Sequence, residues 1–113
     1  MIETKLGEFE EVLLLFTGIL GDDAYSFRIA EEFETQTGRA VSIGAVHSTL
    51  DRLETKGFLT SKMGNATAER GGRRKRIFTI TAIGKRALKT SYDFKVSLWK
   101  QYPDFAAKFN FSF

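Results

Sequence analysis

The feature that most restricts the fold is a run of cations placed between two short β-type segments. Five of the seven residues 70–76 are basic, and two glycines among them allow the backbone to turn. The segments on either side, residues 58–63 and 76–81, have a β-type composition, so the polar loop of residues 64–75 is expected to close a hairpin. A hairpin with a cationic tip is suited to straddling a phosphate backbone or reaching a minor groove. A solubilising loop and a nuclear-localisation-like basic run are the alternatives.

Three segments with helical periodicity precede the hairpin. The first two end at Gly21 and Gly38, and Asp22 and Asp23 are expected to form the turn and N-cap between them. Ser42 is expected to cap the third helix. The apolar residues expected on the buried faces are Phe9, Val12, Leu13, Phe16 and Leu20 in the first helix, Tyr25, Ile29 and Phe33 in the second, and Ile43, Val46, Leu50 and Leu53 in the third.

A fourth helix follows the hairpin. Thr81 is expected to cap it and Pro103 to end or kink it. The element order is therefore helix, helix, helix, hairpin, helix, with no internal repeat and no linker that would split the chain. This order predicts a mainly α (α+β) fold.

The outward face of the third helix is small and polar at its N-terminal half. At 100° per residue, the face opposite the buried one comprises Gly44, Ala45, Ser48, Arg52 and Thr55. Small side chains let a helix backbone approach a surface closely, Ser48 can hydrogen-bond to a phosphate or a base edge, and the helix N-terminus attracts anions. These properties favour entry of the helix into a DNA major groove, although an ordinary amphipathic helix would also show them. Asp51 would face a phosphate badly, so we expect it to form a structural salt bridge.

Charge is distributed very unevenly along the chain. Residues 1–35 hold nine acidic and two basic side chains, whereas residues 36–90 hold twelve basic and three acidic ones. The net charge of +3 conceals this separation. A strongly cationic segment favours a polyanionic partner, and a solvated charged surface without a partner is the alternative.

Composition excludes several classes of function. The chain has no cysteine and one histidine, His47, which excludes a disulfide framework, a thiolate zinc site, a cysteine nucleophile and a multi-histidine metal site. Glu8, Glu10 and Glu11 are expected to form a solvated face of the first helix, with no catalytic constellation around them. We therefore expect a protein that is not an enzyme and has no cofactor. The apolar run at residues 12–20 is shorter than the roughly 20 residues of a membrane span and lacks signal-peptide flanks, so a cytoplasmic location is expected.

Several segments together resemble the PadR family of winged-helix transcriptional regulators. The resemblance covers roughly residues 5–90 and implies a winged helix-turn-helix with a two-stranded wing and a C-terminal dimerisation helix. The matching segments are Leu-Gly-Glu-Phe-Glu at 6–10, Gly-Asp-Asp-Ala-Tyr at 21–25, Val-Ser-Ile-Gly-Ala-Val at 41–46, Thr-Leu-Asp-Arg-Leu-Glu at 49–54, Lys-Gly at 56–57, Glu-Arg-Gly-Gly-Arg-Arg-Lys-Arg at 69–76, and Ile80-Thr81, Gly84 and Ala87-Leu88.

The resemblance implies a homodimeric DNA-binding regulator, usually a repressor, that binds a palindromic operator in double-stranded DNA. Residues 1–82 would form the DNA-binding domain and residues 83–113 the dimerisation helix and tail. Family members often respond to small aromatic compounds, and Tyr92, Trp99 and Tyr102 could line such an effector site, unless these side chains simply pack the dimer. The stripe expected to meet a partner helix, or alternatively to cover the chain's own core, is Leu88, Tyr92, Val96 and Trp99.

One position departs from the family pattern, which usually has a tyrosine where this chain has His47. That side chain is expected either to contact a base or phosphate or to lie half-buried at the edge of the core. A winged-helix module that binds proteins rather than DNA is the alternative function. The candidate DNA-binding residues are Tyr25, Ser42, Gly44, Ala45, His47, Ser48, Arg52, Arg70, Gly71, Gly72, Arg73, Arg74, Lys75 and Arg76.

Overall fold

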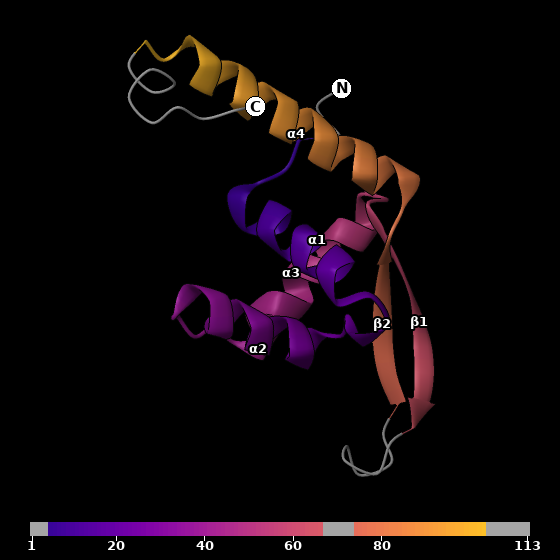
Figure 1. Cartoon of the computed structure of the whole chain (residues 1–113). Coiled ribbons are helices and arrows are strands. Elements are labelled where there is room, and N and C mark those ends of the chain that lie inside the picture. Colours follow the sequence, from indigo (N-terminus) through magenta and orange to yellow (C-terminus); the bar gives the residue numbers. More distant parts are fainter. Residues whose placement is uncertain (1–4, 67–73, 104–113) are drawn as a thin grey trace.

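The order of elements is the one that the sequence predicts. A computed structural model describes residues 5–66 and 74–103 of the chain. In this part of the chain, three helices precede an antiparallel hairpin and a fourth helix follows it (Figure 1). The predicted mainly α fold with a two-stranded wing is therefore confirmed. The elements are α1 (Glu8–Leu20), α2 (Ser26–Thr37), α3 (Ile43–Thr55), β1 (Leu59–Ala66), β2 (Arg74–Ile80) and α4 (Ala82–Gln101).

The connection between α1 and α2 differs from the prediction. Asp22 and Asp23 lie in a short 3-10 turn, and the N-cap position of α2 is occupied by Tyr25. The prediction that the aspartates cap α2 and that Tyr25 lies within the helix is wrong, because Ala24 intervenes and is completely buried. The carbonyl of Ala24 accepts a hydrogen bond of 2.9 Å from the amide of Phe78, which joins this turn to β2.

The other predicted caps are present. The hydroxyl of Ser42 accepts a hydrogen bond of 3.0 Å from the amide of Ala45, and the hydroxyl of Thr81 accepts one of 3.0 Å from the amide of Gly84. Each bond satisfies an amide that the first turn of a helix would otherwise leave without a partner. Gly38 ends α2 in the left-handed conformation, with a φ of 75°.

The hairpin extends further toward its tip than the sequence predicts. Arg74 and Lys75, expected in the loop, belong to β2, and β1 continues past Met63. Pairing runs in register from Leu59 with Ile80 to Met63 with Arg76 and then shifts, so that Ala66 pairs with Arg74. The shift is a local irregularity of the kind that lets a strand bend. Arg74, Lys75 and Arg76 therefore lie in a paired strand and not in the loop.

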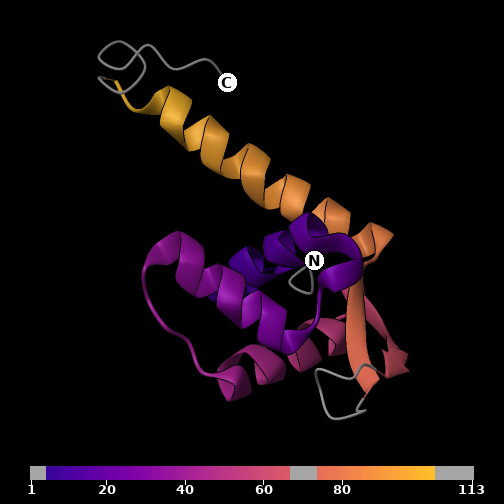
Figure 2. The ribbon, with the colours of Figure 1, turned by 60° about the horizontal axis from the view of Figure 1, so that its bottom comes forward.

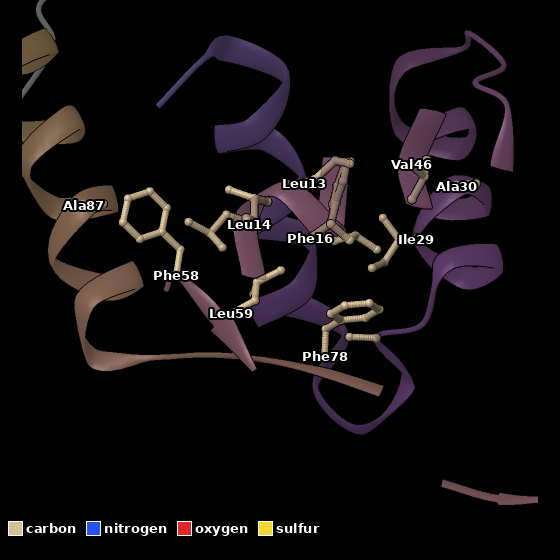
Figure 3. Packing of buried hydrophobic residues seen from close by; sticks show 13 residues of the cluster. Leu13, Leu14, Phe16, Ile29, Ala30, Val46, Phe58, Leu59, Phe78 and Ala87 are labelled. Carbon is tan, nitrogen blue, oxygen red and sulfur yellow. The ribbon is translucent and has the colours of Figure 1, made fainter. Parts of the chain in front are cut away.

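One buried cluster joins all the elements. Figure 3 shows Phe58 on the side of the cluster toward Ala87 of α4, and Val46 at the opposite side, near α2. Ile43, predicted to be buried, is instead 43% exposed, because the first turn of α3 extends past the cluster. The buried hydrophobic residues are Leu13, Leu14, Phe16, Ala24, Ile29, Ala30, Val46, Leu50, Leu53, Phe58, Leu59, Phe78 and Ala87.

The start of α4 is pressed against the base of the hairpin. A Cβ atom added to Gly84 would lie 2.3 Å from the carbonyl oxygen of Phe58, so only glycine fits there. Leu88 of α4 still packs against the core and Lys95 still pairs with Glu11 of α1, while most of the C-terminal half of α4 projects into solvent (Figure 1). Among the described helices, none has both the length and the apolar composition that a membrane crossing requires.

Candidate nucleic-acid interface

The N-terminal half of α3 and the end of the hairpin face the same side of the molecule. Figure 2 shows α3 running beside the hairpin, while the free end of α4 points away on the opposite side. Gly44 and Ala45 are exposed, and a Cβ atom added to Gly44 would meet no atom within 4 Å. The predicted small face of α3 is therefore open, and its backbone can approach another surface closely.

A groove of about 320 Å³ separates the start of α3 from the wing. It brings together predicted site residues from three elements: the N-cap of α2, the exposed face of α3 and strand β2. The side chains that line it are Tyr25, Ser26, Phe27, Ile43, His47, Met63, Arg74, Lys75 and Arg76. Five of these nine were singled out from the sequence as site residues. Of the other four, Ile43 was expected in the core, and Ser26, Phe27 and Met63 were assigned no surface function.

The His47 side chain lines this groove and is 50% exposed. Its Nδ1 atom lies 3.3 Å from the hydroxyl oxygen of Ser26, and its Nε2 atom lies 3.5 Å from a carboxylate oxygen of Asp51. The imidazole is thus oriented by groups on α2 and on its own helix. Ser48, one residue further along, is exposed, and its hydroxyl donates to the carbonyl of Ala45 over 3.3 Å.

One cation of α3 and the lysine at its C-cap are directed at α1 and meet a buried acid. The Nε atom of Arg52 lies 2.8 Å from one carboxylate oxygen of Glu10, and the Nζ atom of Lys56 lies 2.9 Å from each. Glu10 is only 6% exposed, so the prediction of a solvated acidic face is wrong at this residue. Burial by itself would raise the pKa of Glu10, but hydrogen bonds from the amide of Gly7 and from both cations lower it to about 2.

A third cation near α3, Arg76, joins that helix to the wing. One terminal nitrogen of Arg76 lies 3.0 Å from Asp51, the other contacts Glu54, and the Nε atom donates to the hydroxyl of Ser61 over 3.0 Å. The predicted structural salt bridge of Asp51 is therefore confirmed. Sequence reasoning did not find its partner, because Arg76 was grouped with the other wing cations as a candidate phosphate contact.

The remaining described wing cations are placed differently. The Nε atom of Arg74 donates to the carbonyl of Gly64 across the hairpin over 2.9 Å, and the Arg74 side chain is exposed. The Nζ atom of Lys75 lies 4.4 Å from the centre of the Tyr25 ring, within the range of a cation–π contact. Arg70, Gly71, Gly72 and Arg73 lie outside the described residues.

The predicted dimerisation stripe divides into two parts. Leu88 packs against the chain's own core, whereas Tyr92 and Trp99 are 57% and 44% exposed. A hollow of about 410 Å³ near the end of α4 is lined by Lys95, Leu98, Trp99 and Tyr102. The large apolar side chains exposed after the first two turns of α4 are Tyr92, Phe94, Leu98 and Trp99, and Tyr102 at the C-cap is exposed as well.

Metal chemistry finds no support in the described part of the chain. Within residues 5–66 and 74–103, no group of three or more histidine, cysteine, aspartate or glutamate side chains could hold a metal ion.

Comparison with known proteins adds a family and a set of similar folds. A family model described as the transcriptional regulator PadR-like family matches residues 17–90. No curated protein sequence gives a significant match.

Three solved structures illustrate the similarity of fold. A transcriptional regulator from Clostridium thermocellum is 21% identical, with a TM-score of 0.64 over 85% of this chain and 90% of that one. Bacillus subtilis PadR in complex with operator DNA is 19% identical, with a TM-score of 0.62 over 78% of this chain and 48% of that one. The hsRosR-S1 complex is 22% identical, with a TM-score of 0.68 over 96% of this chain and 88% of that one.

Proposed function

Because the chain belongs to the PadR-like family of transcriptional regulators, we propose that it is a homodimeric repressor that binds a palindromic DNA operator. Proteins of this family regulate transcription and are not enzymes, which agrees with the expectation from composition. The finer parts of the proposal are the surface that meets DNA, the assembly into dimers and the control by an effector.

The observation that carries DNA binding is the balance of charge around α3. Three acids that touch this helix or lie on it are paired with three cations, so the group carries no net charge. The acids are Glu10, Asp51 and Glu54, and the cations are Arg52, Lys56 and Arg76. Arg74 and Lys75 then add positive charge beside the positive end of the helix dipole. A groove with this charge attracts a polyanion.

The exposed α3 face supplies the part that would read sequence. Gly44 and Ala45 allow close approach to the major groove, and Ser48 and His47 would present hydrogen-bonding groups to base edges. Ser42 would act through its cap rather than through a base contact, since its hydroxyl already accepts from Ala45. Bacillus subtilis PadR, whose structure contains operator DNA, has a similar fold, which supports this arrangement.

The wing would supply phosphate contacts. Arg74 and Lys75 lie on β2 at the end of the hairpin near its tip. Arg70 and Arg73 belong to the same basic run and precede them in the sequence. Arg76 and Arg52 would act mainly by fixing the position of α3, because both guanidinium groups are already bonded to acids of the chain. Phosphate contacts of this kind position the protein without reading sequence.

The surface proposed for dimerisation is the projecting half of α4. Residues 1–82 would form the DNA-binding domain, and residues 83–113 would form the helix and tail that join two copies. The apolar side chains on this part of α4 are exposed and do not pack against the core of the same chain. Burying them against a second copy would be favourable. A two-fold dimer also presents two copies of α3 to the two halves of a palindrome.

A small aromatic effector would bind near the end of α4. Lys95, Leu98, Trp99 and Tyr102 line a hollow that is open in a single chain and that a second copy would enclose. Binding that alters the packing of two α4 helices would change the placement of the DNA-reading surfaces, which is how an effector would relieve repression.

The proposal is tested by fluorescence-anisotropy titration of the full chain with DNA from upstream of its own gene and with a shuffled duplex. We expect binding to the upstream duplex at two protomers per site, weakened by a rise in salt concentration, and weaker binding to the shuffled duplex. Absence of binding to either duplex at low salt would overturn the proposal in favour of a protein-binding module.

A further inference from the structure

Three large apolar side chains are exposed around the groove between α3 and the wing. Phe27 of α2, Ile43 of α3 and Met63 of β1 are 50%, 43% and 48% exposed, and all three line that groove. They lie outside the buried cluster of the chain, and they lie on elements other than α4. An exposed apolar group of this size is stabilised when a partner covers it.

Ile43 has a special position among the three, because it is the first residue of α3. The next two residues, Gly44 and Ala45, are exposed and have no side chain or only a methyl group. Their side chains therefore do not hinder the approach of a surface to this end of α3. Ile43 is therefore an exposed apolar side chain at the end of α3 that is proposed to approach DNA.

The charge of the groove identifies the class of partner. Arg74 and Lys75 line the same groove as Ile43, so a purely apolar protein surface placed there would strip water from two cations without compensating them. DNA supplies phosphates for these cations and an apolar group for Ile43 in one surface. In the major groove of unmodified DNA, that apolar group is the C5-methyl of thymine.

We propose that Ile43 packs against the methyl group of a thymine in each half of the operator and thereby selects thymine at that position. Phe27 and Met63 form apolar walls beside the contact and exclude water from it. This inference rests on the proposed DNA-binding function and adds a specific base preference to it. The contact is a source of specificity that is separate from hydrogen bonding by Ser48 and His47.

The experiment uses duplexes that the full-length protein selects from a random pool. Each thymine of one half-site is then replaced singly by deoxyuridine, which pairs identically but lacks the methyl group. Binding is measured for the wild-type chain, for Ile43→Ala and for Ile83→Ala. Ile83 is a matched control, because it is 46% exposed near the start of α4 and lies outside the groove.

We expect one deoxyuridine position to weaken wild-type binding roughly fourfold, the effect of losing one buried methyl contact. The same replacement should leave the affinity of Ile43→Ala unchanged and weaken Ile83→Ala as it weakens the wild type. Equal effects of deoxyuridine on the wild type and Ile43→Ala at every thymine would overturn the contact while leaving DNA binding intact. Failure to enrich any sequence would overturn the proposed function itself, and circular dichroism of each variant confirms that it is folded.

Discussion

Asp51 of α3 and Arg76 of β2 form an ion pair of 3.0 Å that ties the helix proposed to read DNA to the wing. The same guanidinium contacts Glu54 one turn further along α3. Since Arg76 also lies 4.8 Å from the centre of the Phe78 ring, it is held on a buried aromatic residue as well as by two acids. Arg76 therefore adds an ionic link between α3 and the wing to the apolar packing that already joins them.

Replacing Arg76 by alanine should destabilise the fold, because it leaves Asp51 and Glu54 without their cation. We expect the free energy of unfolding to fall by about 1–3 kcal/mol, measured by urea denaturation. Lys62→Ala, which removes an exposed cation of the same hairpin, should change stability by less than about 0.5 kcal/mol. Equal losses for the two variants would contradict the structural role of Arg76.

The Glu10 carboxylate should make stability depend on pH in acid. Its pKa in the folded chain is about 2, below the ordinary value of 4.5, so its contribution is complete above pH 4.5 and is lost as pH falls toward 2. Glu10→Gln should therefore be less stable than the wild type by about 3 kcal/mol at pH 7, with a difference that shrinks below pH 4.5. Urea denaturation at several pH values measures this, with Glu8→Gln as the exposed control in the same turn.

Arg74→Ala should weaken binding to all DNA sequences rather than change the preferred one. Loss of one phosphate contact lowers the slope of log K against log salt by about 1. Lys89→Ala is the control. It changes the net charge by the same amount, but Lys89 lies on α4 and does not line the groove, so the slope should be unchanged. Anisotropy titrations at four salt concentrations give both slopes, and identical slopes for the two variants would refute a wing contact at Arg74.

Leu98→Glu should separate the proposed dimer without unfolding the protomer. Leu98 is 48% exposed on α4, so a charge there is harmless in one chain but unfavourable within an apolar interface. Light scattering after size exclusion should give about half the mass of the wild type, with an unchanged circular dichroism spectrum. Lys100→Glu, also exposed on α4, is a stricter control for the introduced charge, because it changes the net charge by two units rather than one. A wild-type protein that is already monomeric would contradict the proposal.

Two glycine-to-alanine variants should have opposite effects on stability. Gly84→Ala places a methyl group against the Phe58 carbonyl and should destabilise the chain by about 2 kcal/mol or more. Gly44→Ala, in an open helical position, should stabilise it by about 0.5–1 kcal/mol while weakening DNA binding, because the added methyl group stands on the face proposed to approach DNA. Thermal denaturation and anisotropy together distinguish the two effects.

Local signals account for the part of the fold that the sequence predicts correctly. The caps at Ser42 and Thr81 act within three residues of the helix start, so they can be recognised without knowing the tertiary structure. The periodicity of Val46, Leu50 and Leu53 likewise identifies the buried face of α3. Periodicity fails at Ile43, because it shows which residues lie on the same helix face. It does not show where along the helix the buried core ends.

The sequence alone could not predict which distant cations and acids form ion pairs. Arg52 and Glu10 are 42 positions apart, and Arg76 and Glu54 are 22 apart, so their contacts depend on how α1, α3 and β2 pack. A run of basic residues gives no sign of which member will fold back on the protein. For the same reason Glu10, placed among glutamates in the first turn of α1, could not be distinguished from its exposed neighbour Glu8.

Consecutive acids on α1 connect this helix to both α3 and α4. Glu10 pairs with Arg52 of α3 and with Lys56 at the C-cap of that helix, while Glu11 pairs with Lys95 of α4 over 2.7 Å. In a dimer joined through α4, α1 would connect α3 to the dimer interface in each chain. The distance between the two copies of α3 would then be set by the protein structure. An operator with one base pair inserted between its halves would move one half by about 3.4 Å and rotate it about the DNA axis, so that only one copy could stay engaged.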